Sequence, residues 1–261
     1  MDKLKLTNHL KDIELKNKMF KVIDKANNTI KKYEINKTEF MNPYEIKNAI
    51  SILNSNHDIK YTIDGGYDEA ERSVIFIYPY YNEYEDIEEK LRYIQIEGNF
   101  KFKTVSHKDY LGSILNLGIK REKIGDIIVH ENFAQIIVSA DICDFIIFNL
   151  EKISRNNVKL KEIKKEEIIK NKVEYKEISF TSSSKRIDSI ISGVYNISRQ
   201  ESIKYISSER VYMNYEKIGS ASKEVEENSL VSTRGKGRVI ITDLSGITSK
   251  GRIKVKAKLI V

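Results

Sequence analysis

The sequence predicts an α+β protein built from three consecutive parts. Residues 1–64 repeat apolar side chains at helical spacing, which indicates a helical N-terminal segment. Residues 65–172 alternate strand and helix patterns in a way typical of a small ferredoxin-like or RRM-like domain. Residues 173–261 place two short amphipathic helices before a β-ribbon. A chain of 261 residues has room for parts of this size.

The N-terminal segment contains two helical patterns that we expect to pack into a core. The second pattern is preceded by Asn42-Pro43, which combines a capping side chain with a proline at the first helical position. We therefore expect a helix from Tyr44 to Leu53. In the first pattern, the apolar residues that recur among lysines and acids are Leu10, Ile13, Phe20, Ile23 and Ile30.

The central domain is predicted to begin after the turn Asp64-Gly65-Gly66. A charged stretch, 164–172, follows it and has the composition of an exposed linker or a solvated helix. Between these limits we expect a buried strand over 73–78, an acidic helix over 83–91, a strand over 93–97, a helix over 107–117, a hairpin of 126–129 with 133–138, a helix over 141–153 and a last strand over 158–163.

The C-terminal part opens with a predicted strand over 173–180. A helix follows over 185–194, with Ile187, Ile190, Ile191 and Val194 on one face. Ser198 and Glu201 have capping-box spacing and start a second helix, in which Ile203 and Ile206 are expected to point inward. Strands are then expected near 211–214, 230–231, 239–242 and 253–259, the last with Lys254, Lys256 and Lys258 on one face.

Composition excludes several classes of protein. Cys143 is the single cysteine, which leaves no intrachain disulfide framework and no cysteine-based metal cluster. It lies in an apolar stretch, where a buried and inert thiol is expected. The four histidines show no close ligand spacing, so we expect neither a metal nor a cofactor. Without a signal-peptide core or an apolar run of the ~20 residues that cross a bilayer, the sequence predicts a cytoplasmic protein that avoids the membrane.

Excess positive charge is confined to the last third of the chain. Residues 178–261 contain 15 Lys+Arg against 8 Asp+Glu, a net charge of +7. The whole chain has 45 against 38, which is also +7, so residues 1–177 are neutral overall. A neutral body with a basic terminal module indicates a polyanion partner, because clustered charge creates a local attracting field.

Motifs in the C-terminal part resemble the S4 RNA-binding domain, which is of the αL type. They are Ser184-Lys-Arg-Ile-Asp188, Ser198-Arg199, Ile206, Val211-x-Met-Asn214 and Arg234-Gly-Lys-Gly-Arg238. Upstream, the stretches 65–72 (GGYDEAER) and 107–126 (HKDYLGSILNLGIKREKIGD) are similar to the YlmH family. That resemblance implies an S4 domain after an RRM-like domain, and binding to structured RNA on the large ribosomal subunit by a monomer. Glu209, Tyr215 and Ser229 depart from the usual S4 residues.

The S4 positions make physical sense as a phosphate-binding surface. Two neighbouring helix N-termini offer N–H groups and a positive dipole end to a phosphate. Arg186 and Arg199 stand in the first turns of those helices, where a guanidinium can form a bidentate contact. The expected RNA-binding residues are Lys185, Arg186, Ser198, Arg199, Lys204, Asn214, Lys217, Arg234, Lys236 and Arg238.

An enzyme is the alternative that we reject. His107, Asp109, Arg121 and Asp126 have the residue types of acid–base chemistry, but Ser106 to Asp109 is also what helix capping selects. Gly112, Gly118 and Gly125 suit tight packing and turns. The glycine-rich cofactor loop of a methyltransferase is missing, and Arg186-Ile-Asp188 lacks the glycine-rich surroundings of a pseudouridine synthase motif.

The sequence is therefore interpreted as a non-catalytic binder of structured RNA, rRNA or tRNA. Its expected role is in translation or ribosome-associated quality control. YlmH-family genes often lie near bacterial cell-division genes, so the first alternative is a division-linked adaptor that acts through protein contacts. An RNA-modifying enzyme that uses the S4 domain for targeting is the second.

Overall fold

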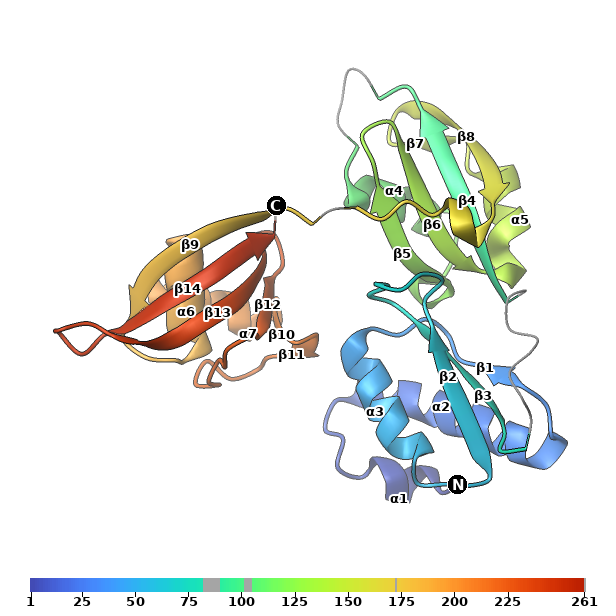
Figure 1. Ribbon diagram of the computed structural model, residues 1–261, viewed down its shortest axis with the longest axis horizontal. Helices are drawn as coiled ribbons and strands as arrows, with labels where there is room; N and C mark the ends of the chain where they lie inside the picture. Colours follow the sequence, from blue (N-terminus) through green and yellow to red (C-terminus); the bar gives the residue numbers. More distant parts are fainter. Residues whose placement is uncertain (82–89, 101–104, 172, 261) are drawn as a thin grey trace. The chain divides into compact units, whose positions relative to one another are not determined.

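A computed structural model describes residues 1–81, 90–100, 105–171 and 173–260 (Figure 1). The chain divides into two compact units, Met1–Asn171 and Lys172–Val261. The division falls next to the boundary expected between residues 172 and 173. Helices and antiparallel sheets occur in both units, so the predicted α+β class is confirmed.

The N-terminal part of the first unit packs helices α1 (Lys3–Thr7), α2 (Ile13–Lys32) and α3 (Pro43–Leu53) with a three-stranded antiparallel sheet of order β1-β3-β2. Buried side chains of α2 and α3 contact Ile59, Ile75 and Ile77 of the sheet. The start of α3 follows the prediction, since Asn42 and Glu45 form a reciprocal capping box around Pro43.

Two expectations about this part are wrong. Residues 1–64 are not wholly helical, because they contain the strands β1 (Asn36–Lys37) and β2 (Ile59–Asp64). The strand expected to open the central domain, β3 (Val74–Pro79), pairs with both of them. All six residues of β3 are buried, so the strand needs layers on both sides. A boundary at residue 64 would divide this sheet.

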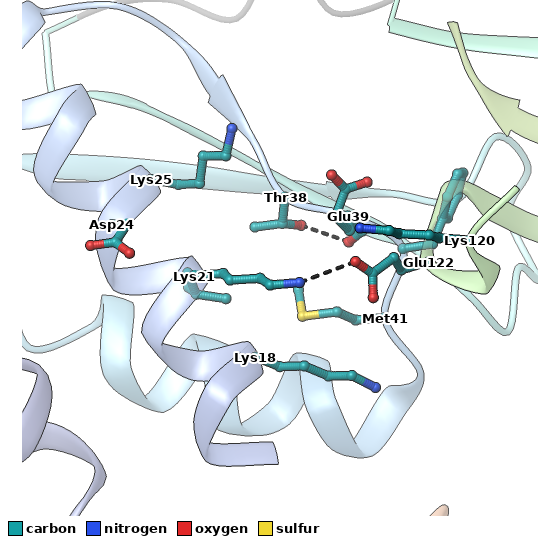
Figure 2. A pocket seen from close by; sticks show the side chains of 11 residues that line it. Lys18, Lys21, Asp24, Lys25, Thr38, Glu39, Met41, Lys120 and Glu122 are labelled. Atoms are coloured by element: carbon teal, nitrogen blue, oxygen red, sulfur yellow. Dashed lines mark hydrogen bonds and ion pairs between the residues drawn. The ribbon is translucent and has the colours of Figure 1, made fainter. Parts of the chain in front are cut away.

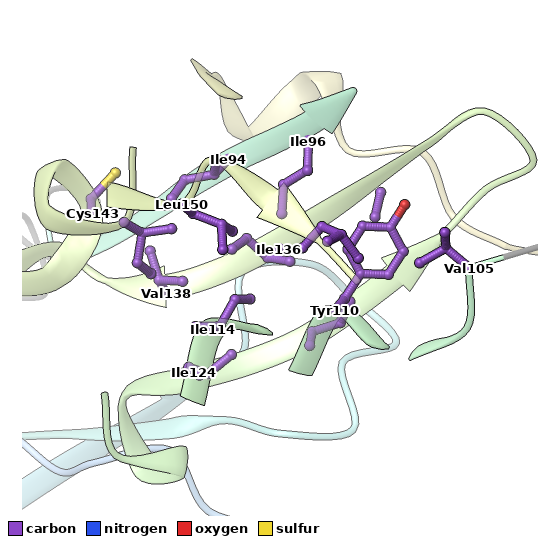
Figure 3. Close-up of a cluster of buried hydrophobic side chains, with 14 residues drawn as sticks. Ile94, Ile96, Val105, Tyr110, Ile114, Ile124, Ile136, Val138, Cys143 and Leu150 are labelled. Atoms are coloured by element: carbon purple, nitrogen blue, oxygen red, sulfur yellow. The ribbon is translucent and has the colours of Figure 1, made fainter. Parts of the chain in front are cut away.

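The central part is a five-stranded antiparallel sheet of order β5-β6-β4-β8-β7 with two helices on one face. Alternate residues of β4 and β6, including Ile94, Ile136 and Val138, form a core with Tyr110 and Ile114 (Figure 3). The acidic helix expected over 83–91 lies mostly outside the described residues, and Leu91 already belongs to β4. The bounds are β4 Leu91–Gly98, α4 His107–Leu115, η2 Arg121–Lys123, β5 Ile124–Val129, β6 Phe133–Ser139, α5 Ala140–Asn149, β7 Lys152–Ile153 and β8 Asn156–Ile163.

The opposite face of this sheet is covered by the chain itself. Tyr93 and Ile137 pack against Phe40 and Phe76 from the N-terminal part. Gln135, which is fully buried, donates to the Glu167 carbonyl (2.9 Å) and accepts from the Ile169 amide (2.8 Å). The stretch 164–171, with η3 at Lys165–Glu167, is tethered to the sheet by these two hydrogen bonds, and all of its residues except the half-buried Ile168 are exposed, as its charges predicted. The amide side chain of Gln135 thus provides hydrogen-bond partners for the backbone groups of Glu167 and Ile169.

The second unit is a six-stranded antiparallel sheet of order β11-β10-β12-β13-β14-β9 with α6 and α7 on one face. Ile187, Ile190 and Ile191 are fully buried, and Ile206 is buried on α7, as predicted. Ile203 is 42% exposed, so it does not point into the core. The bounds are β9 Tyr175–Ser182, α6 Ile187–Tyr195, α7 Arg199–Ser207, β10 Val211–Met213, β11 Glu216–Lys217, β12 Leu230–Thr233, β13 Gly237–Ile247 and β14 Ile253–Ile260.

Candidate nucleic-acid interface

Two arginines share one buried carboxylate at the start of the two helices of the second unit. Asp188 lies in the first turn of α6 and its side chain is fully buried. Arg186 donates to it through Nε (3.2 Å) and Nη2 (3.4 Å), and Arg199 through Nε (2.8 Å). Burial raises the pKa of Asp188, but the hydrogen bonds and charges of the arginines outweigh it and hold the pKa below its ordinary value.

The arginines themselves remain open to solvent. The side chain of Arg186 is 38% exposed and that of Arg199 is 52% exposed, and only some of their N–H groups are used on Asp188. A guanidinium has five N–H donors, so the remaining ones can contact a phosphate. Asp188 thus fixes two sequence-predicted residues side by side.

The N-terminus of α6 differs from the expectation of free amides. The Ile187 amide donates to the Lys223 carbonyl (2.8 Å), and the Ser189 amide to the side chain of Asp188 (3.0 Å). The stretch 223–225 crosses this end, because the Val225 amide also donates to the Lys185 carbonyl. At α6 the guanidinium of Arg186 is therefore more available to a phosphate than the helix amides are.

Helix α7 begins as the sequence predicts. Ser198 caps it and accepts from the Glu201 amide (3.1 Å), so its hydroxyl has a structural role. Lys204 is exposed on the same helix, and Lys185 is exposed in the turn before α6. Helix α7 carries Arg199 at its first residue and Tyr205 near its last.

The end of α7 meets the turn 234–237 through stacked cations and rings. The guanidinium of Arg210 lies 4.6 Å from the centroid of the Tyr205 ring, and the ammonium of Lys236 lies 5.9 Å from the same ring. Arg210 also donates through Nη2 to the Arg234 carbonyl (2.8 Å). Gly235 has φ +84°, and an added Cβ would come within 2.9 Å of Arg210 Nη2, so a side chain there would displace that guanidinium.

Two further cation–ring pairs extend along the strands. Arg234 lies 5.3 Å from the Tyr212 ring, and Arg238 lies 5.5 Å from the Tyr215 ring while donating to its hydroxyl (2.9 Å). The turn after β12 lies against α7, because Lys236 reaches both Glu201 and Tyr205 of that helix. We call the arginine pair and the cation–ring pairs together the basic surface, and it consists of Arg186, Arg199, Tyr205, Arg210, Tyr212, Tyr215, Arg234, Lys236 and Arg238.

Arg210 and the three tyrosines were missed by the sequence analysis. The available signal was the interleaving of aromatic and basic residues over 205–215, opposite the glycine-spaced basics of 234–238. Rings and cations at such spacing become informative only when strand pairing is known, and β10 pairs with β12.

The departures from S4 residues are accommodated locally. Glu209 adopts the left-handed conformation (φ 56°) that a glycine would take, and its carboxylate pairs with Lys217 (3.0 Å). Asn214 and Tyr215 also have positive φ, and the Asn214 side chain accepts from the Leu230 amide (2.8 Å). Asn214 and Lys217 are therefore engaged within the protein, Asn214 in holding the β10–β11 turn.

The residues with acid–base character in the central part have structural partners. Asp109 forms a capping box with Ser106 and accepts from the Ser154 hydroxyl (2.9 Å). Asp126 accepts from the Tyr67 hydroxyl (2.8 Å) and from the amides of Glu71 and Arg72, so it fixes the 65–72 motif onto β5. Gly125 packs against Phe40 and Gly118 has φ +84°, but Gly112 faces open space.

Two further features are absent from the described residues. No group of three or more His, Cys, Asp or Glu side chains there could hold a metal ion. None of the helices among them combines the length and apolar character that a membrane span requires.

Comparison with known proteins covers both units. Residues 14–82 match the family model described as "YlmH, N-terminal", and residues 83–167 match the model described as "Putative RNA-binding domain in YlmH". The chain is 31% identical over 223 residues to "Ribosome-associated protein quality control protein P2" of Bacillus subtilis (strain 168), covering 85% of this chain and 86% of the relative.

A solved structure gives the same assignment. The "Cell division protein ylmH" of Streptococcus pneumoniae superposes with a TM-score of 0.52 at 28% sequence identity, over 61% of this chain and 96% of the solved chain. The two family models, the curated relative and the solved structure agree, and the chain belongs to the YlmH family.

Proposed function

We propose that this protein binds structured RNA, rRNA or tRNA, on the large ribosomal subunit, and acts in ribosome-associated quality control without catalysing a reaction. In this proposal the second unit is an S4-type RNA-binding domain and the protein works as a monomer in the cytoplasm. The observation that carries it is the basic surface, where six cationic side chains are held by Asp188 or stacked on tyrosines.

Physical reasons favour RNA as the partner of this surface. A-form RNA presents phosphates and 2′-hydroxyls on a shallow groove, which short basic elements can contact without reading a sequence. The surface lies in the part of the chain that carries all of the excess positive charge. Support for the ribosomal part comes from the printed name of the B. subtilis relative, and support for RNA contact in the first unit comes from the description of its family model.

The test is crosslinking in cells followed by sequencing of the bound RNA, together with co-sedimentation with large subunits. We expect rRNA or tRNA to be enriched, and binding to fall steeply with salt because each neutralised phosphate releases counterions. Replacing Arg199 and Arg234 by glutamate should abolish co-sedimentation, while the same change at Lys31, an exposed lysine of the first unit, should not. Enrichment unaffected by the Arg199 and Arg234 changes would contradict the assigned surface.

A division-linked adaptor is the second candidate, favoured by the printed name of the S. pneumoniae structure. A surface for protein contact exists on α5, where Phe148 is 81% exposed and Phe145 is 47% exposed. Replacing both phenylalanines by serine separates the candidates. A cell-division defect in this variant, with its RNA crosslinks intact, would favour the adaptor.

A further inference from the structure

The first unit contains a lysine-rimmed pocket of about 380 Å³, away from the basic surface (Figure 2). One side is formed by α2 and the floor by residues 38–41, which follow β1. The other side is formed by Lys120 and Glu122, next to η2. The Phe40 amide donates to the Glu122 carbonyl (2.8 Å), so the floor and the far side are tied together. The volume is within the range of small-molecule sites, roughly 300–1,000 Å³.

Helix α2 presents three lysines to this pocket. Lys18, Lys21 and Lys25 are spaced by three and four residues, which places them on one face of the helix. The side chains of Lys25 and Lys120 enter from opposite sides (Figure 2). An anion in the pocket would therefore have cations on both sides.

The carboxylates around the pocket are already paired with cations of the protein. Asp24 pairs with Lys3 (2.7 Å) and Glu39 with Lys123 (3.2 Å). Glu122 pairs with Lys21 (3.1 Å). That hydrogen bond lowers the pKa of Glu122, which keeps the carboxylate ionised.

Only some of the lysines around the pocket form ion pairs with carboxylates of the protein. Lys18 is held by Glu45 (2.5 Å) and Glu14 (3.3 Å). Lys25 and Lys120 form no ion pair or side-chain hydrogen bond with any residue that the structure describes. The ammonium groups of Lys25 and Lys120, on opposite sides of one cavity, favour an anionic ligand, since a lysine binds phosphate as a point charge.

The floor of the pocket is lined by apolar side chains. Val22 and Phe40 are 2% exposed and Met41 is 4% exposed, and all three line the pocket. An apolar floor beneath a charged rim is typical of sites for organic molecules with one polar end.

We propose that the pocket binds a nucleoside phosphate, with its base on the apolar floor and its phosphate between Lys25 and Lys120. A nucleotide is favoured over other organic anions because Lys120 and Glu122 lie within residues 83–167, which match an RNA-binding family model. The nucleotide has two possible sources, a free mononucleotide or an unpaired nucleotide of an RNA chain. This site is independent of the proposed function of the basic surface.

The experiment uses the full-length protein in NMR and calorimetric titrations. The probes are adenosine and uridine monophosphate, adenosine, inorganic phosphate and an unstructured pentaribonucleotide. We expect the nucleotides to bind and to shift signals of α2 and of 120–122, while adenosine and inorganic phosphate bind more weakly. The double variant Lys25→Gln/Lys120→Gln should lose roughly tenfold or more in affinity, the loss expected for a charge-assisted contact.

Matched variants keep the result interpretable. Lys31→Gln changes an exposed lysine of the same helix outside the pocket, and should bind nucleotides like the wild type. Arg186→Ala/Arg199→Ala should also retain nucleotide binding, which separates this site from the basic surface. Thermal melting would show that each variant is folded.

Each outcome decides the proposal. Binding of the mononucleotide identifies a free nucleotide, and binding of the pentaribonucleotide alone identifies an unpaired RNA nucleotide; both support it. Unchanged affinity in Lys25→Gln/Lys120→Gln, equal binding of inorganic phosphate, or no binding of any nucleotide overturns it.

Discussion

Arg199, the first residue of α7, donates a hydrogen bond at 2.8 Å to the fully buried carboxylate of Asp188 in the first turn of α6. Because Arg186 donates to the same carboxylate, one acid sets the position of two guanidinium groups from different helices. The acid is hidden and the cations are open to solvent, so the group that faces a ligand is positive. This geometry makes the two arginines interdependent.

We predict that Arg186→Ala and Arg199→Ala each weaken binding of structured RNA by about 1.5–3 kcal/mol, the range for charge-assisted hydrogen bonds. Their effects should be coupled, because removing one arginine leaves Asp188 free to reorient the other. Arg199→Lys should restore only part of the loss, since lysine lacks the planar fork. RNA titrations of the single and double variants measure the coupling.

Lys256→Ala is the control for this prediction. Lys256 pairs with Asp243 (3.4 Å) between neighbouring strands of the sheet, so its loss should cost far less and mainly at low salt. If the arginine variants bind like the wild type and Lys256→Ala does not, the RNA lies across the sheet.

The second prediction concerns the pH dependence contributed by Asp188. Its pKa in the folded protein is below the ordinary value of about 3.9, so the ionised carboxylate stabilises the fold. That stabilisation is fully present above about pH 4 to 5 and is lost as the pH falls through the folded pKa. Asp188→Asn should therefore lower the free energy of unfolding by about 1–3 kcal/mol near neutral pH, and by much less near pH 3.

Urea titrations followed by NMR signals of the second unit, at both pH values, measure this difference. Glu177→Gln is the matched control, because that carboxylate is exposed on β9 of the same unit. A loss for Asp188→Asn that does not change with pH would show that the effect is one of packing and not of charge.

Local signals made some features predictable. Asn42-Pro43, Ser106 to Asp109 and Ser198 to Glu201 each place a capping side chain beside its helix, so the starts of α3, α4 and α7 follow the sequence. Arg199 was assigned to a helix start for the same reason, and Arg186 from the apolar spacing of the helix that follows it. The capping interactions span three residues or fewer.

Features that depend on distant partners were missed. Strand β3 pairs with residues 36–37 and 59–64, and its own composition does not predict which strands it pairs with. Gln135 forms hydrogen bonds with Glu167 and Ile169, which tether a charged and exposed stretch to the sheet. Asp188 was read as a motif residue, and its contact with Arg199, eleven positions away, required the packing of α6 on α7.

The third prediction is that Cys143 is unreactive in the folded protein. Its side chain lies in the core of the central part, and burial raises its pKa to about 11. Near pH 8 an ordinary thiol is partly ionised, with a pKa of about 8.5, whereas Cys143 would be almost wholly protonated. Reaction with a disulfide reagent should be at least about 100-fold slower than for free cysteine. Full and rapid reaction should appear in urea, and a fast reaction without urea would contradict the buried position.

The last prediction compares two helical glycines. An added Cβ at Gly112 in α4 would meet nothing within 4 Å, so Gly112→Ala should stabilise the protein by about 0.5–1 kcal/mol through lower chain entropy. An added Cβ at Gly193 in α6 would meet the Phe180 ring at 2.2 Å, a contact that requires the ring, the helix or β9 to move. Gly193→Ala should therefore destabilise the second unit by about 1–3 kcal/mol despite the same gain in helix propensity.

Urea titrations with NMR signals from each unit separate the two effects. The double variant Gly193→Ala/Phe180→Leu should recover part of the loss, because the smaller side chain removes the ring that the methyl group meets. If Gly193→Ala proved as stabilising as Gly112→Ala, α6 would not pack on β9 at this position. Helix α6, which contains Asp188, would then have a different orientation. The contacts of Arg186 and Arg199 with Asp188 would change with it.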